Sequence, residues 1–445
     1  MNEQITRLPA VVIAVVAAGL LSVTLVADVP AAEARINGLS GATTFNFTAK
    51  ADHLSTGEGS VLLFWGIANG NGRAQYTAPT LILNQGDSVT IALTNELPVA
   101  TSLVFPGQTH VSASGGTAGL LTREAAANGG TVTYTFLADH PGTYLYHSGT
   151  NPEIQVDMGL VGAIIVRPTG FDPLNPTAYG PPDTAYDNEV LYLMTEMDPR
   201  LHALVESQGV AALESTDYLS NPEPNYWFLN GRNAPDTMAG DGVAYLPVQP
   251  YSCMPMMHPG DKLLMRNIGG GKDLHPFHTH GNHFRLFAKD GRLLRTSDAA
   301  PISDLATYEY THKAIPGETF DFIFEWTGEQ LGWDIYGTGP GFHHTCTPDA
   351  SGFDLVTKEY CPDHGKPIPV QLPPDFEVAI GSHWGGSPYL GHTAQMPPGA
   401  AGLNPMGGFT YMWHSHQERD MVNNDVFPGG MMTMLMVVAP GTHIH

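Results

Sequence analysis

Short stretches in which apolar and polar residues alternate, separated by turn-forming residues, recur along this chain. In residues 79–97 (PTLILNQGDSVTIALTNEL), alternating apolar residues lie on both sides of Gln85-Gly86-Asp87, which predicts two strands joined by a turn. Residues 131–147 repeat this pattern around a Pro-Gly turn, and residues 159–167 (GLVGAIIVR) predict a buried strand. We therefore expect one antiparallel β-sandwich over about residues 36–170.

A second series of strands follows a proline-rich segment at residues 168–182, which is typical of a linker. The predicted strands of this series lie at residues 189–194, 226–231, 260–267, 284–287, 319–324 and 431–438. Residues from about 328 to 406 are rich in Gly, Pro and His and lack long apolar stretches. They are interpreted as a large loop insertion in a second sandwich.

Two sequence phrases occur once in each half of the chain. The Gly-Asp turn at residues 84–89 (NQGDSV) has a counterpart at 259–264 (PGDKLL), and Tyr-Leu-Tyr-His-Ser at 144–148 has a counterpart at 411–415 (YMWHS). This repetition indicates a duplication. The predicted fold is all-β, with a first domain at residues 35–182 and a similar second domain at residues 183–445.

The N-terminal segment has the pattern of a secretory signal. Arg7 precedes an uncharged run at residues 8–27, and Ala32-Glu33-Ala34 forms an A-x-A cleavage pattern before Arg35. We interpret residues 1–34 as a signal peptide, so the protein is expected to be exported to the periplasm or the extracellular space. The run is also long enough for a retained anchor, and membrane contact is expected only in that case.

Composition narrows the classes of function. The 445 residues carry 19 Lys and Arg against 43 Asp and Glu, a formal net charge of −24. This charge argues against nucleic acid as a partner, because phosphate binding requires a basic patch. It favours solubility and the attraction of cations. A solvated acidic surface of an exported protein accounts for this charge at least as well as attraction of cations does.

The chain has three cysteines, Cys253, Cys346 and Cys361. An exported protein can form disulfides, and Cys346 and Cys361 are close together in a loop-like region, so they are the predicted pair. A zinc site built from these two cysteines with His343, His344 and His364 is the alternative. Cys253 is left unpaired.

Histidines in two strands carry the strongest chemical signal. His275-Pro-Phe-His278-Thr-His280 and Trp413-His414-Ser415-His416 each contain an H-x-H pair. Alternation along a strand puts the two histidines of a pair on the same face, about 7 Å apart. Imidazole is a ligand for Cu, Zn, Fe or Ni. One such pair is ambiguous, but two in a β-rich exported chain predict a metal site.

A further histidine, His147, stands alone at the end of the strand pattern at residues 131–147. A lone histidine is more often a hydrogen-bonded structural residue than a ligand.

The histidine motifs resemble those of the multicopper oxidases, the laccases and their relatives. H-P-F-H-T-H-G is similar to their third copper motif, W-H-S-H to the fourth, and Y-L-Y-H-S-G to the second. The strand phrasing also resembles that of the two-domain copper nitrite reductases. The resemblance implies that both domains are cupredoxin-like and that copper is the cofactor.

The resemblance also implies a ligand set. His278 matches a type 2 copper ligand, and His275 matches a type 1 ligand. The remaining matches are to type 3 ligands: His147 and His416 for one copper ion, His280 and His414 for the other.

The positions at which this chain departs from the family pattern are as informative as the matches. A blue copper site needs a cysteine thiolate beside two histidines, yet Ser415 and Ser148 stand at the two positions where the families carry that cysteine. Asp420 stands where a further type 1 histidine is expected, and Gly149 where the second motif has its second histidine.

The first copper motif of the family has no match in this chain, and His110 is only a weak substitute for its histidines. Five matched histidines can hold one copper ion with open positions, or two at most.

Two hypotheses of function follow. The first is a copper-dependent oxidoreductase of the multicopper oxidase superfamily without type 1 copper, which oxidises a metal ion or a small phenolic compound. The second is a non-catalytic copper-binding or extracellular structural protein that keeps the fold. By analogy with two-domain relatives, in which histidines of neighbouring chains meet, the resemblance also implies a homotrimer.

Two smaller groups leave their roles open. Cys253-Met-Pro-Met-Met-His258 offers soft ligands for Cu(I), but methionine also fills cores. Glu418, Asp420 and Asp425 can orient the neighbouring histidines or face water.

Overall fold

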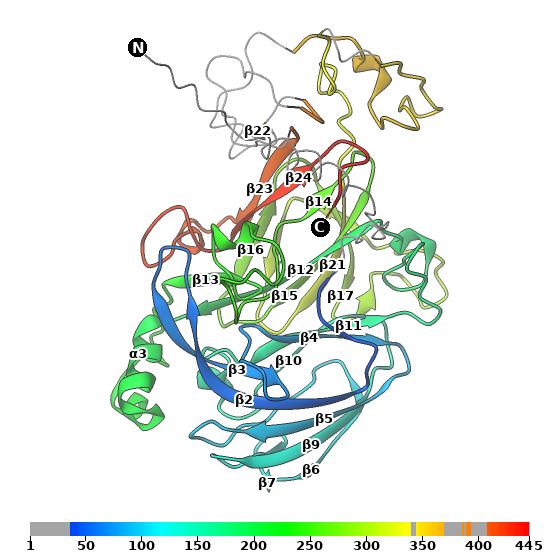
Figure 1. The fold of residues 1–445 in the computed structure, drawn as a ribbon. Helices are drawn as coiled ribbons and strands as arrows, with labels where there is room; N and C mark the ends of the chain where they lie inside the picture. Colours follow the sequence, from blue (N-terminus) through cyan, green and yellow to red (C-terminus); the bar gives the residue numbers. More distant parts are fainter. Residues whose placement is uncertain (1–35, 340–343, 369–384, 387–388, 393–406, 445) are drawn as a thin grey trace, which may run out of the picture.

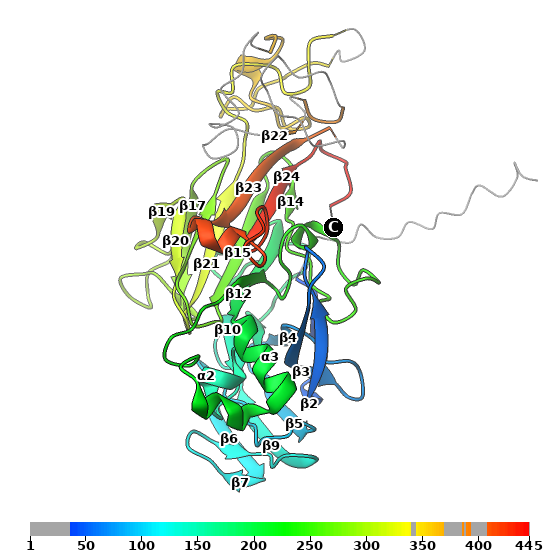
Figure 2. The same cartoon turned by 90° about the vertical axis from the view of Figure 1, so that its left-hand side faces the viewer.

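The computed structural model describes residues 36–339, 344–368, 385–386, 389–392 and 407–444. The predicted signal peptide, His343 and parts of the predicted insertion at 328–406 lie outside these residues. Within the described part, two pairs of β-sheets lie one above the other (Figures 1 and 2). The all-β prediction is confirmed.

Two sheets form the first unit. The five-stranded sheet has the order β3(Val61–Asn69), β2(Thr44–Ser55), β5(Ser88–Asn95), β9(Gly130–Leu137) and β6(Thr109–Gly115). The four-stranded sheet has the order β1(Leu39–Ser40), β4(Ala78–Asn84), β11(Val161–Arg167) and β10(Gly142–His147). A short pair, β7(Thr117–Ala118) and β8(Arg123–Glu124), lies outside these sheets.

Alternation of apolar residues builds the core of this unit. Val89, Ile91 and Leu93 of β5 are buried, while the residues between them are partly exposed. In β11 every residue is buried because both faces are covered. One face contributes Ile164 to the first core, and the other contributes Ile165 to an apolar cluster shared with strands of the second unit. The continuous apolar run at 159–167 therefore marks the strand at the boundary between the two units.

Two larger sheets form the second unit. The first has the order β13(Tyr226–Leu229), β12(Asn188–Met197), β15(Lys262–Gly269), β21(Thr319–Glu325), β17(Phe284–Lys289) and β18(Arg292–Leu293), with β19(Thr307–Glu309) also paired to β17. The second has the order β14(Met256–Met257), β24(Met432–Val437), β23(Phe409–Ser415), β16(His275–Thr279) and β20(Thr311–Ala314), with β22(Gly385–Gly386) paired to β23.

The predicted antiparallel sandwiches also contain parallel strand pairs. The pairs β1–β4, β4–β11 and β2–β5 are parallel in the first unit, and β12–β15 and β14–β24 are parallel in the second. The two strands of a parallel pair cannot be joined by a tight turn, so this pairing depends on long connections that alternation within one strand does not reveal.

Buried charges join the two units. Arg167 of β11 and Arg266 of β15 both pair with Glu189 of β12, and all three side chains are almost fully buried. Burial alone raises the pKa of Glu189, but the two guanidinium groups outweigh it and lower that pKa to about 2. The carboxylate is therefore charged and compensated at neutral pH.

Helices are few among the described residues. Within them, the α-helices are α2(Pro152–Gln155) and α3(Pro199–Gln208), and the 3-10 helices are η1(Pro182–Thr184), η2(Val210–Ser215), η3(Asp236–Met238), η4(Cys361–Asp363) and η5(Glu418–Met421). The side chain of Asp198 caps α3 by accepting a hydrogen bond from the Arg200 N–H. Leu201 and Val205 of α3 pack into the core of the first unit.

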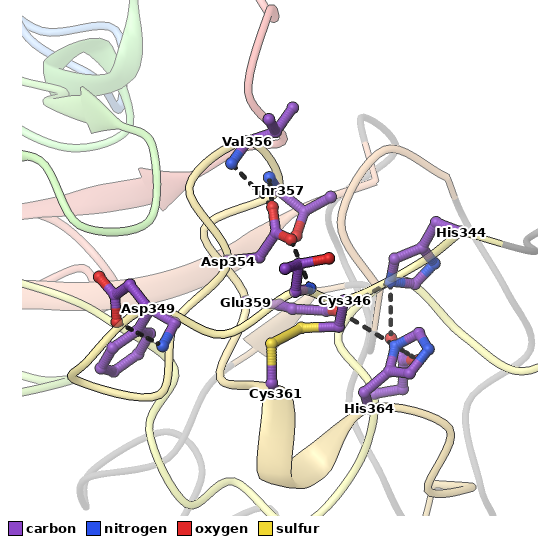
Figure 3. Close-up of a disulfide and its surroundings, with 12 residues drawn as sticks. His344, Cys346, Asp349, Asp354, Val356, Thr357, Glu359, Cys361 and His364 are labelled. Carbon is purple, nitrogen blue, oxygen red and sulfur yellow. Dashed lines mark hydrogen bonds and ion pairs between the residues drawn. A yellow bond between two sulfur atoms is a disulfide. The ribbon is translucent and has the colours of Figure 1, made fainter.

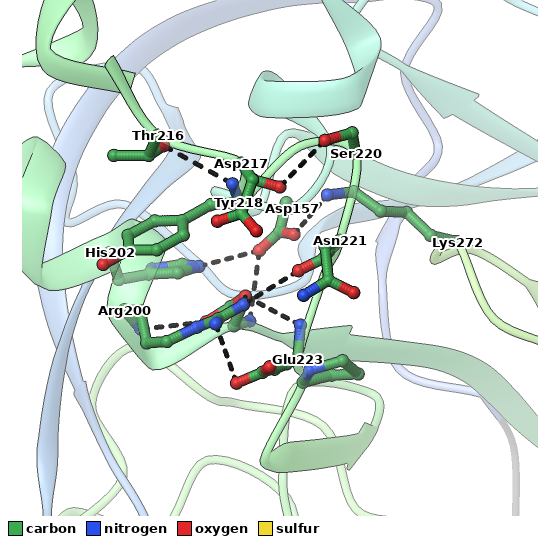
Figure 4. A network of polar contacts seen from close by, with 12 residues as sticks. Asp157, Arg200, His202, Thr216, Asp217, Tyr218, Ser220, Asn221, Glu223 and Lys272 are labelled. Atoms are coloured by element: carbon green, nitrogen blue, oxygen red, sulfur yellow. Dashed lines mark hydrogen bonds and ion pairs between the residues drawn. The ribbon is translucent and has the colours of Figure 1, made fainter. Parts of the chain in front are cut away.

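A polar network holds α3 in this position (Figure 4). Asp157, from the first unit, lies 3.1 Å from His202 Nε2 of α3 and 2.5 Å from the Nζ atom of Lys272. Lys272 follows β15, so one buried carboxylate connects three segments that are distant in the sequence. The helix therefore bridges the units.

The described part of residues 328–406 extends from the end of the second unit (Figure 1) and contains η4 and β22. Cys346 and Cys361 are joined in a disulfide there. Among the described residues, no helix is both long enough and apolar enough to cross a membrane.

Candidate metal centre

Strand pairing brings the two H-x-H motifs together. β16 and β23 are antiparallel neighbours, and His278 lies directly opposite His414 in their register. The next pair, Thr279 and Trp413, faces the other side of the sheet because side chains alternate. His280 follows β16 directly and returns to the same side as His278.

Three histidines converge at this point. His278, His280 and His414 each offer a ring nitrogen, and these atoms all lie within 4.8 Å of one another. The Nε2 atoms of His280 and His414 are 3.2 Å apart. The ring of the exposed His416 lies beside them, with its centroid 4.8 Å from that of His278. The structure therefore brings together four of the six histidines that the sequence singled out.

Hydrogen bonds orient the rings. His278 Nδ1 lies 2.6 Å from Thr311 Oγ1 on the neighbouring strand β20. His414 Nδ1 donates to its own chain at the Ser415 carbonyl, 2.7 Å away, which leaves Nε2 of His414 with a lone pair. Trp413 Nε1 donates to the His280 carbonyl at 3.1 Å and positions that residue through its backbone.

One buried nitrogen in this cluster has no hydrogen-bond partner. It is Nδ1 of His280, whose residue is 1 % exposed. A buried polar atom without a partner is costly, and coordination of a metal ion through this nitrogen would satisfy it. The donors present therefore fit a metal that prefers imidazole.

The electrostatics of the cluster keep the rings neutral. Burial, followed by the neighbouring His414, lowers the pKa of His280 to about 3. Burial likewise lowers the pKa of His278 and that of His414 to about 4 each. Neutral imidazole is the form that binds metal. The cluster is therefore ready for metal throughout the neutral range, without first losing protons.

His275 is not part of this cluster, contrary to its predicted role as a copper ligand. Its Nδ1 lies 2.9 Å from Asp420 Oδ2 and its Nε2 lies 3.1 Å from Glu196 Oε2. Burial alone lowers the pKa of His275, but the two carboxylates outweigh it and raise that pKa to about 9. Such an imidazolium has no lone pair to offer a metal.

Ser415 completes the same network, because its Oγ donates to Asp420 Oδ2 at 2.6 Å. The positions at which the resemblance expects two type 1 histidines and the cysteine are thus filled by His275, Asp420 and Ser415, held by one another and by Glu196. Asp420 is the acid that orients neighbours, whereas Glu418 and Asp425 are exposed. Sequence reasoning missed Glu196, which β12 supplies from a distant part of the chain.

His147 lies apart from the cluster. It ends β10 in the first unit, and its Nδ1 lies 2.9 Å from the Ser148 carbonyl. Burial lowers the pKa of His147. A Cβ at Gly149 would lie 2.7 Å from Val104 Cγ1, so a histidine cannot be accommodated there without a shift. The weak substitute, His110, is an exposed residue of β6.

Cys253 is a buried thiol rather than a ligand. Its Sγ donates to the Leu229 carbonyl at 3.0 Å, and burial raises the pKa of the thiol to about 12. Metal binding requires the thiolate. Met256 and Met257 are buried in the apolar cores, so packing accounts for this segment.

Comparison with known proteins shows what this chain is similar to. Residues 67–170 match the multicopper oxidase family model. The blue copper oxidase of Nitrosomonas europaea has a similar fold, with 18 % identity, a TM-score of 0.53 and coverage of 88 % of this chain and 85 % of that one. The copper nitrite reductase of the same organism aligns at 14 % identity and a TM-score of 0.50, over 90 % and 96 % of the two chains. The family model thus matches one part of the chain, and the chain shares the cupredoxin-like fold of these two structures.

Curated relatives match over shorter segments. Laccase abr2 of Aspergillus fumigatus is 40 % identical over 96 residues, which are 21 % of this chain and 16 % of the laccase. The L-ascorbate oxidase of Cucurbita pepo var. melopepo is 33 % identical over 162 residues, 36 % of this chain and 26 % of that protein. The matched segment thus spans about a quarter or less of either relative.

Proposed function

We propose that this protein is an exported copper-binding oxidoreductase that oxidises a metal ion or a small phenolic compound at a histidine-held site without type 1 copper. The observation that carries the proposal is the convergence of His278, His280 and His414, three buried neutral imidazoles with an unsatisfied Nδ1 on His280. The names of the matched relatives, oxidases and a laccase among them, support this class of reaction.

Copper suits this donor set. Imidazole nitrogens favour copper among the divalent metals of the first transition row. His278, His280 and His414 would hold the ion, and His416 lies close enough to join them. Copper bound there would supply one-electron redox chemistry between a donor and dioxygen. The protein contributes neutral rings in a fixed orientation, which Thr311 and the Ser415 carbonyl maintain.

The donor of electrons would approach the cluster directly. In this chain Ser415 provides no thiolate, and its hydroxyl is bonded to Asp420. His416 is exposed, and so is Tyr310, whose ring centroid is 5.7 Å from that of His278. A small phenol or a metal ion can therefore come within contact of the histidines, and the net charge of −24 favours a cation. Neither the exposed approach to the histidines nor the negative net charge suits nucleic acid as a partner.

We extend the proposal to a homotrimer. Within one chain, the described contacts of His147 stay inside the first unit. A neighbouring chain would be needed to bring His147 to a cluster, as the family analogy implies. The signal pattern at residues 1–34 supports export to the periplasm or beyond.

The second candidate is a copper-binding protein without catalysis. The buried pairing of His275 with Asp420 and Glu196 favours it, because it occupies the place of an electron-entry site. Two measurements on the same purified protein separate the two candidate functions. They are the copper content and the oxygen uptake, the latter with a phenol and with a reduced metal ion as electron donors. Bound copper with donor-dependent oxygen uptake supports the enzyme. Bound copper without uptake supports the binding protein, and no bound copper contradicts both.

A further inference from the structure

A second group of possible ligands lies far from the histidine cluster, beside the disulfide. Asp334, His344, Glu359 and His364 each offer one donor atom, and these atoms all lie within 4.8 Å of one another. Figure 3 shows His344, Glu359 and His364 beside the Cys346–Cys361 disulfide. The donors come from two segments that the Cys346–Cys361 disulfide joins and from the segment around Asp334. The disulfide removes both sulfurs as ligands and leaves two imidazoles and two carboxylates.

The distances suit a four-coordinate ion. His344 Nε2 lies 2.7 Å from Glu359 Oε2 and 4.0 Å from Asp334 Oδ1. His364 Nδ1 lies 3.0 Å from Glu359 Oε1 and 3.3 Å from Asp334 Oδ2. Tetrahedral zinc, with bonds of about 2.0–2.2 Å to N and O, would place neighbouring donors about 3.3–3.6 Å apart. Small shifts of the side chains reach that arrangement.

Charge supplies an independent argument. The side chains of Asp334 and Glu359 are each 2 % exposed, and two buried carboxylates side by side repel one another. Glu359 Oε1 makes no hydrogen bond, although it lies close to His364. A divalent cation would neutralise both carboxylates, satisfy this oxygen and bind the two imidazoles in their neutral form.

The surrounding loop holds the donors in place. Backbone N–H groups of Tyr336 and Gly365 donate to the two oxygens of Asp334, at 2.9 and 2.8 Å. Each carboxylate oxygen keeps a second lone pair for a metal. The carboxylate of Asp354 accepts N–H groups from Thr347, Val356 and Thr357 and so fixes the chain between the two cysteines.

We propose that Asp334, His344, Glu359 and His364 form a structural site for a zinc-class divalent cation, separate from the histidine cluster between β16 and β23. Four protein donors leave no open position, which is typical of a structural rather than a catalytic zinc site. The ion would fasten the two disulfide-linked segments to the chain around Asp334.

The test is a titration of the metal-stripped, disulfide-intact full chain with Zn²⁺ alone. We compare the parent with two double variants. One combines His344→Ala with His364→Ala, and the control combines His53→Ala with His140→Ala. The control histidines also lie beside one carboxylate each, Glu206 and Asp139, but do not converge. His280→Ala with His416→Ala serves as the variant of the other cluster.

We expect the loop variant, His344→Ala with His364→Ala, to lose one zinc equivalent. The affinity for that equivalent should fall by more than about 100-fold, because loss of a residue that only orients a ligand already costs up to roughly that much. The control pair and the His280/His416 variant should keep that equivalent. Glu359→Gln, which keeps the shape of the side chain, should also weaken the binding of this zinc equivalent. Zn²⁺ should slow proteolysis between residues 344 and 368 in the parent but not in these two loop variants. Unchanged zinc binding in the loop variant, or loss of all zinc in the His280/His416 variant, would overturn the proposal.

Discussion

His275 and Asp420 form a buried ion pair, with Nδ1 of the histidine 2.9 Å from Oδ2 of the acid. Glu196 holds the other ring nitrogen. The pair lies at positions that, by resemblance to the multicopper oxidases, are expected to hold type 1 copper, and in this chain a network of charges fills them. Loss of one partner would leave an uncompensated buried charge.

Restoring the cysteine alone should not restore blue copper. In Ser415→Cys, both ring nitrogens of His275 would still be bound to carboxylates, so the thiolate would have no histidine beside it. We expect copper stoichiometry equal to that of the parent and no intense blue absorption in the copper-loaded variant. The appearance of that absorption would show that His275 releases its carboxylates easily.

Stability should fall as the pH rises into the alkaline range. The pKa of His275 is about 9 in the folded chain and about 6.5 in an unfolded one. The stabilisation is therefore complete below about pH 6.5 and is lost as the pH rises through about 9, with a total of roughly 3 kcal/mol.

Urea unfolding of the metal-free protein from pH 6 to pH 10 measures this effect. His275→Gln should be less stable than the parent at pH 6, and the difference should shrink towards pH 10. His53→Gln is the control. A pH-independent difference would contradict the charged state of His275.

Copper binding should persist below the ordinary titration range of histidine. Because burial lowers the pKa of His278 and His414 to about 4 and that of His280 to about 3, protons compete with the metal only near those values. The sequence alone would place the loss of affinity near pH 6.5. Competition titrations with a copper chelator between pH 4 and pH 8 distinguish the two. A tenfold loss of affinity already at pH 6 would refute the shift.

The hydrogen bond between Thr311 and His278 should matter for affinity. Thr311→Val removes the group 2.6 Å from His278 Nδ1 while keeping the shape of the side chain. Loss of such a partner weakens metal binding by about 10–100-fold. Thr307→Val, on β19, which precedes β20 in the sequence but pairs with β17, is the matched control because Thr307 is exposed and its hydroxyl bonds to Glu309. Equal affinities in the two variants would assign Thr311 a purely structural role.

Converging histidines should be far more sensitive to substitution than exposed ones. We expect His280→Ala with His416→Ala to lose copper, and His53→Ala with His140→Ala to bind copper as the parent does. Copper stoichiometry after dialysis provides the comparison. Retention of copper in the first variant would rule out the proposed site.

The sequence by itself determined many of the strands and the two histidine pairs that supply the main cluster. Alternation along residues 79–97 and 131–147 predicts strands, and two H-x-H pairs predict histidines on one face of each strand, because the side-chain period of a strand is two residues. Both properties are local, so they can be read without knowing which strands are neighbours.

Only the tertiary structure decided which groups meet. The register that sets His278 opposite His414, the parallel strand pairs, and the approach of Glu196 to His275 all depend on contacts between segments far apart in the chain. The same holds for Asp334 and Glu359, which no motif marks. The sequence offered His275 as a ligand by its place in a motif, whereas folding surrounded it with two carboxylates whose charge fixes it as an imidazolium. A side chain's type is local, but its protonation and its partners are set by what packs around it.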